Sequence, residues 1–129
     1  MTGFDIDDIK FEEGSEMPLL HPNTFEPLKD EKGQKVFLRL AGMDSAVYRK
    51  AQNAIANKRT KGSRMIKLTA ERLEADSMEI ICKCTLGWSD NLKIKGKAPK
   101  NAEEIYESAK WIKEQADTWI HDRANYLGN

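Results

Sequence analysis

Hydrophobic and polar positions change their spacing along the chain near Gly42. Before it, apolar residues lie in short β-like runs. The clearest run is 36–40, which is rich in strand-forming residues and lies between two glycines. The run 17–22 contains two prolines, which confine it to an edge strand or an extended arm. Residues 17–41 are therefore predicted to form an antiparallel β-hairpin or a small three-stranded meander.

Beyond Gly42 the apolar positions recur every three or four residues, as expected for helices. Asp44 and Thr69 are suitable N-caps for a first and a second helix, and Gly87 is suited to a left-handed cap that ends the second. Asn101 and Glu104 have the spacing of a capping box that begins a third helix, with a break near Ser108. The predicted helices span 44–59, 69–86 and 101–126. The expected fold class is α+β, mainly α, with the β-hairpin or meander followed by three to four helices.

Residues 1–16 differ from the rest because they contain few apolar groups, show no clear period and are strongly acidic. Such a segment buries too little apolar surface to order itself, so we expect a mobile acidic arm. The remaining residues, 17–129, have the length of one small domain.

Charge sums to zero over the chain, with 21 basic and 21 acidic residues, but its distribution is uneven. Residues 1–31 carry 9 acids and 2 bases, giving −7, and residues 32–67 carry 10 bases and 1 acid, giving +9. This contrast is typical of a nucleic-acid surface or of pairing between the two segments. Tyr48 is the only aromatic residue between 45 and 70, so stacking partners for bases are missing. The pattern favours a solvated or protein-facing basic helix over nucleic-acid binding.

The remaining composition argues against catalysis, cofactors and membranes. No apolar run is long enough to cross a membrane, and the first residues lack the regions of a secretory signal, so we expect an intracellular protein. Cys82 and Cys84 would point about 200° apart on a helix and could not face one metal ion, so we expect Cys84 in the core and Cys82 half-buried. Neither histidine has a local nucleophile signature, and the interior glycines stand singly. We expect no enzyme activity, no cofactor and no metal site.

Two of the three tryptophans lie on the last predicted helix. Trp111 and Trp119 are eight residues apart, which places their side chains within about 80° of each other on one broad face. That face either packs into the core against the second helix, the commoner outcome, or forms part of an exposed groove for a partner.

Several stretches, taken together, resemble a known family. The chain contains GMDSAVYR at 42–49, LTAERLEAD at 68–76 with TLGW at 85–88, and an ending in DRANYL at 122–127. In this order the stretches resemble small tail-assembly proteins of long-tailed bacteriophages and prophages. HPNT at 21–24 also fits, although the family often has glycine where this chain has Phe25. The resemblance covers residues 17–128.

The resemblance implies a tail assembly chaperone, which binds the long tape-measure protein in the host cytoplasm and keeps it soluble until tail-tube subunits polymerise around it. The tape-measure protein is then the partner, with the tail-tube protein as a second one. Partner contact is expected at the last helix and its exit, through Trp111, Trp119, Tyr126 and Leu127. One alternative is a minor structural protein of the tail or neck that stays in the virion. A third is a phage nucleic-acid-binding or regulatory protein. Homo-oligomerisation is left open.

Overall fold

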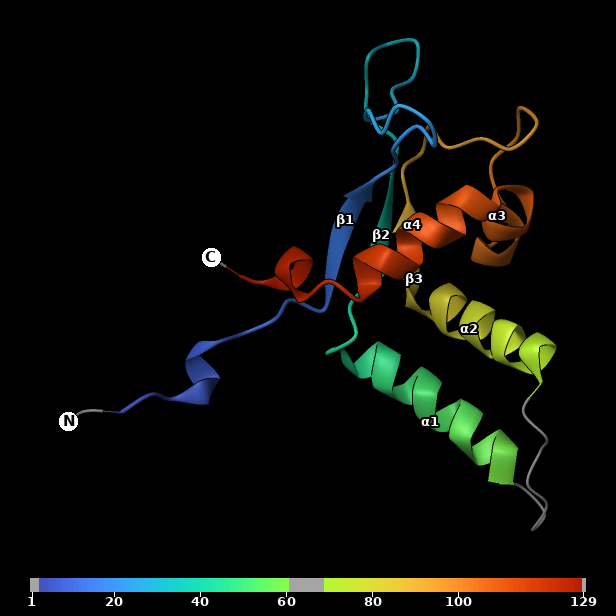
Figure 1. Ribbon diagram of the computed structural model, residues 1–129. Coiled ribbons are helices and arrows are strands. Elements are labelled where there is room, and N and C mark those ends of the chain that lie inside the picture. Colours follow the sequence, from blue (N-terminus) through green and yellow to red (C-terminus); the bar gives the residue numbers. More distant parts are fainter. Residues whose placement is uncertain (1–2, 61–68, 129) are drawn as a thin grey trace.

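The computed structural model describes residues 3–60 and 69–128 of the chain. It has the predicted class, α+β and mainly α (Figure 1). The strands are β1 (Gly14–Pro18), β2 (Phe37–Ala41) and β3 (Thr85–Trp88). The helices are α1 (Ala46–Thr60), α2 (Ala70–Cys84), α3 (Ala102–Ser108) and α4 (Lys110–Ile120). Short 3₁₀ helices occur at Ile6–Asp8 and Arg123–Tyr126.

The sheet is antiparallel, in the order β1-β2-β3, with Met17 opposite Leu38 and Leu38 opposite Trp88. The strand predicted at 36–40 is confirmed by β2. The edge strand expected at 17–22 is found earlier, at 14–18, and the third strand begins with residues 85 and 86, which the periodicity assigned to the second helix. The Thr85 hydroxyl donates to the carbonyl of Ile81 at 2.7 Å where α2 ends. The chain then pairs with the remaining edge of β2, so Gly87 lies in a strand and not in a left-handed cap.

The acidic segment contributes more structure than its composition predicted. Strand β1 begins at Gly14, inside the range 1–16 that was expected to be a mobile arm. Residues 3–13 are exposed and lead away from the sheet (Figure 1). The amide of Glu12 donates to the carbonyl of Tyr126 at 2.7 Å, so the base of the arm is tied to the end of the chain.

The last predicted helix is divided in two and is shorter than expected. Helix α3 ends at Ser108, α4 begins at Lys110 and ends at Ile120, and residues 123–126 are 3₁₀, so the prediction of one helix over 101–126 was wrong while the break near Ser108 is confirmed. In a continuous helix, Tyr106 and Ile112 would point about 120° apart. The extended residue Ala109 changes the direction of the chain, so both side chains reach the core.

Two of the three predicted N-cap residues are confirmed. Thr69 caps α2 and Asn101 caps α3, as predicted. For α1 the cap is Ser45, whose hydroxyl accepts from the amide of Tyr48 at 3.1 Å, and not Asp44. Asp44 instead pairs with Arg123, which approaches at 2.8 Å from the other end of the chain.

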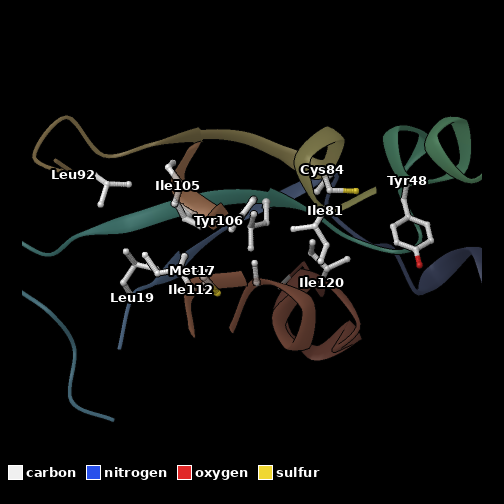
Figure 2. Packing of buried hydrophobic residues seen from close by; sticks show 14 residues of the cluster. Met17, Leu19, Tyr48, Ile81, Cys84, Leu92, Ile105, Tyr106, Ile112 and Ile120 are labelled. Carbon is white, nitrogen blue, oxygen red and sulfur yellow. The ribbon is translucent and has the colours of Figure 1, made fainter. Parts of the chain in front are cut away.

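The core lies where the sheet meets the helices. Figure 2 shows side chains of β1, α2, α3 and α4 meeting beside the sheet. Leu38 and Leu40 of β2 are fully buried there, together with Ile105 of α3 and Ile120 of α4. Helices α1 and α2 lie side by side and project from this core (Figure 1). None of the described helices is long and apolar enough to cross a membrane.

Candidate partner-binding groove

Helix α4 has two apolar faces with different surroundings. Ile112, Ala116 and Ile120 are buried and form the core side of the helix. Trp111 and Trp119 lie on a second side, half-buried, where they pack against the edge of the core while part of each ring stays accessible. Each ring is therefore partly packed against the core and partly exposed.

Gln115 fixes the segment that faces this side of α4. Its side-chain amide nitrogen donates to the carbonyl of Leu20 at 2.8 Å, and its amide oxygen accepts from the Leu20 amide at 3.0 Å. A second contact joins α4 to β1 itself, because the indole nitrogen of Trp119 donates to the hydroxyl of Ser15 at 2.8 Å. The extended segment that follows β1 is thus held beside the helix by paired hydrogen bonds.

Between these elements lies a groove of about 460 Å³, which we call the Trp groove. Helix α4 contributes Trp111 and Trp119 as its apolar side chains. The other side consists of apolar residues from the end of β1 and the segment after it, namely Met17, Pro18, Leu20, Pro22 and Phe25. Such an apolar lining is suited to the side chains of a partner.

The charge of the Trp groove has one sign. Its lining includes the carboxylates Glu114 and Asp122, and none of the described lining residues is a lysine or an arginine. This asymmetry favours an occupant that carries positive charge beside its apolar groups.

The four predicted contact residues separate into two groups. Trp111 and Trp119 line the Trp groove. Tyr126 is only 3% exposed, and its ring packs against the backbone of Gly42; burial raises the pKa of its phenol to about 12. Leu127 is 50% exposed but forms a β-bridge with Phe11 and does not line the groove.

Sequence reasoning missed the other half of the groove. The sequence predicts only an edge strand or extended arm at 17–22 within the hairpin or meander of 17–41, and notes Phe25 as a departure from the family pattern. The proline-interrupted apolar run was the available signal, because apolar residues that cannot continue a strand must find another surface. Its pairing with α4 depends on Gln115, which lies 95 residues from Leu20.

Two of the stretches that carry the family resemblance meet each other in space. Arg123 of the ending pairs with Asp44 through two nitrogens, at 2.8 and 3.2 Å. Tyr126 packs on Gly42, and the Tyr48 hydroxyl lies 2.9 Å from Nε2 of His121. The motif residues at 42–49 and 121–126 therefore hold the start of α1 against the end of α4.

The Tyr48–His121 pair has hydrogen-bond partners at both nitrogens of the imidazole ring. Nδ1 of His121 contacts the carbonyl of Asp117 at 2.8 Å, so both ring nitrogens are engaged. Burial raises the pKa of the Tyr48 phenol, which disfavours the phenolate. The arrangement is suited to joining helices, and Figure 2 shows Tyr48 at the margin of the core.

The two cysteines behave as small apolar residues. Cys84 is buried and Cys82 is half-buried, as predicted, and burial raises the pKa of both thiols to about 11. Within residues 3–60 and 69–128, no cluster of three or more metal-ligating side chains is found.

The basic helix finds its acidic partners in α2. Arg59 contacts the nearly buried Asp76 at 2.7 Å, and Lys58 contacts Glu79 at 2.7 Å. From the arm, Glu13 accepts a hydrogen bond from the first amide of α1 at 3.2 Å. The positive charge of α1 is thus partly neutralised by the neighbouring helix.

Comparison of the chain with protein-family models, with curated proteins and with solved structures found no match.

Proposed function

We propose that this protein is a phage tail assembly chaperone, which binds the tape-measure protein through the Trp groove and keeps it soluble while the tail tube forms. The groove is the observation that carries the proposal. An aggregation-prone helical client needs apolar anchor sites on a soluble carrier, and the Trp groove presents two tryptophans and Phe25 on a charged exterior. The resemblance of residues 17–128 to the tail-assembly family supports the same function.

A substitution that fills the groove tests this function directly. Thr118 is exposed on α4, lines the groove and has Glu114 one turn before it. In Thr118→Arg the new side chain can pair with Glu114 on the helix surface and occupy the groove without disturbing the core. Gln52→Arg on the exposed side of α1 is the matched control.

The assay is co-expression with the tape-measure protein of the same phage, followed by measurement of the soluble fraction of that client. Wild type and Gln52→Arg should keep the client soluble, and Thr118→Arg should leave it in the pellet. A client that stays insoluble with wild type would refute the chaperone function. Equal solubility with Thr118→Arg would place the binding site elsewhere.

A minor structural protein of the tail or neck is the second candidate, and the arm favours it. Phe4 and Ile6 are 71% and 78% exposed, which suits a segment that reaches a neighbouring subunit. Mass spectrometry of purified virions beside the infected-cell lysate separates the two functions. A chaperone should be abundant in the lysate and absent from virions, whereas a structural subunit should have a fixed copy number per virion.

A further inference from the structure

The turn at the end of the Trp groove holds a phenylalanine in a backbone conformation that phenylalanine disfavours. Phe25 has a φ of 60°, in the left-handed region where a β-carbon crowds the backbone and glycine is favoured. Its side chain is 69% exposed, so burial does not compensate for the strain. A strained residue persists when the structure around it imposes the conformation, and such residues gather at functional sites.

The hydrogen bonds of the turn impose this conformation. The Phe25 amide donates to the carbonyl of His21 at 2.9 Å, and the His21 amide donates to the carbonyl of Glu26 at 2.9 Å. Nδ1 of His21 accepts from the amides of Asn23 and Thr24 at 3.1 and 3.3 Å. The turn is therefore closed by its own bonds, and Leu20 beside it is fixed to α4 by Gln115. The backbone of Phe25 is therefore held in one place at the rim of the groove.

The charge of the groove indicates which kind of partner segment would contact Phe25. The chain's own arm has exposed apolar residues, but it also carries Asp5, Asp7 and Asp8, which Glu114 and Asp122 of the groove would repel. A partner segment that carries lysine or arginine beside an apolar side chain has the complementary charge. Such a segment would place its apolar group against the tryptophans and its cation near the two carboxylates.

We propose that the Trp groove recognises an apolar anchor flanked by lysine or arginine, and that Phe25 is a recognition residue held in a strained turn to cover that anchor. This inference rests on the proposed function, because it specifies which segments of the tape-measure protein bind. Fixing the backbone that carries the ring before binding reduces the conformational entropy lost on association. The strain is then a stability penalty retained for recognition.

The probe is an array of overlapping 15-residue peptides that covers the tape-measure protein, with full-length protein as the ligand. Wild-type protein should bind a subset of peptides in which an apolar or aromatic residue lies within one helical turn of a lysine or arginine. Replacing those cations by glutamate in the same peptides should reduce binding about tenfold. Equal binding of lysine and glutamate versions would refute the charge requirement.

Substitutions at Phe25 separate recognition from folding. Phe25→Gly and Phe25→Asn tolerate a positive φ, so both should raise the urea midpoint of unfolding while weakening peptide binding about tenfold. Phe25→Leu keeps both the strain and an apolar side chain, so it should retain most binding without gaining stability. A stabilised Phe25→Asn with unchanged binding would refute the recognition role of Phe25, and a destabilised Phe25→Asn would refute the strain.

Charge reversal in the groove completes the test. Glu114→Lys should abolish the preference for lysine-flanked peptides, whereas Glu74→Lys on the exposed side of α2 should leave it unchanged. If the wild-type protein binds no peptide and does not keep the client soluble, the proposed function fails. If the wild type binds and the Phe25 and Glu114 variants match it, only this further inference fails.

Discussion

Replacing Gly42 by alanine tests whether Tyr126 is a core residue. A β-carbon at Gly42 would lie 2.9 Å from three atoms of the Tyr126 ring, whereas carbon atoms in ordinary contact are about 3.5–4.0 Å apart. The φ of Gly42 is not positive, so the expected effect comes from this contact alone. The ring would have to retreat by about 0.6 Å or more. It is 97% covered by its surroundings, and its own carbonyl accepts from the amide of Glu12.

Overpacking of this kind costs about 1–3 kcal/mol, and the rigid surroundings of the ring place our expectation near 2 kcal/mol. With a urea m-value of about 2 kcal/mol/M for a domain of this size, Gly42→Ala should lower the midpoint of unfolding by about 1 M. The assay is urea unfolding at pH 7, followed by the fluorescence of the three tryptophans. Gly87→Ala is the matched control, because its β-carbon would meet nothing within 4 Å.

A double-mutant cycle then isolates the contact. Tyr126→Leu should itself destabilise the fold by removing buried ring atoms. In that background, adding Gly42→Ala should cost less than about 0.5 kcal/mol, because the obstructing ring is gone. Additive effects, or a Gly42→Ala protein as stable as wild type, would refute the close packing of Tyr126 on Gly42 and would restore Tyr126 as a candidate contact residue.

Two further predictions concern buried charge and buried thiols. Asp76→Asn should destabilise the protein by about 2 kcal/mol, because it leaves Arg59 without its nearly buried partner. Glu79→Gln, at the exposed pair with Lys58, should cost under about 0.5 kcal/mol. Equal melting temperatures of the two variants would contradict this prediction. The thiols of Cys82 and Cys84 ionise near 9.0 when unfolded and at about 11 when folded, so the free energy of unfolding should fall as pH rises from 9 to 11. Constant stability over that interval would refute their burial.

Local signals in the sequence predicted much of the helical structure. Thr69 and Asn101 begin α2 and α3 as expected, because an N-cap acts on amides only two or three residues away. The first helix is within two residues of its predicted span at both ends. Its cap was assigned to Asp44 because aspartate and serine are both suitable caps, and only the pairing of Asp44 with Arg123 leaves the role to Ser45.

The sequence-based predictions were wrong where a contact with a distant segment determines the structure of a residue. Residues 85 and 86 continue the helical period of α2, but the open edge of β2 draws them into β3. Tyr126 follows the last helix and was therefore expected to contact a partner. Because Gly42 has no side chain, the Tyr126 ring packs against its backbone and is buried. These outcomes depend on contacts between residues far apart in the chain, which no local window contains.

The candidate site shows the same division. The sequence by itself determined that Trp111 and Trp119 share one broad face of α4, because that follows from helical geometry alone. Only the tertiary structure decided that the face is partly open and that 17–25 lies opposite it. It also decided that the turn holds Phe25 at the rim with a positive φ. The physical reason is that the position of 17–25 beside α4 depends on Gln115 binding Leu20 across 95 residues, and a long-range hydrogen bond leaves no period in the sequence.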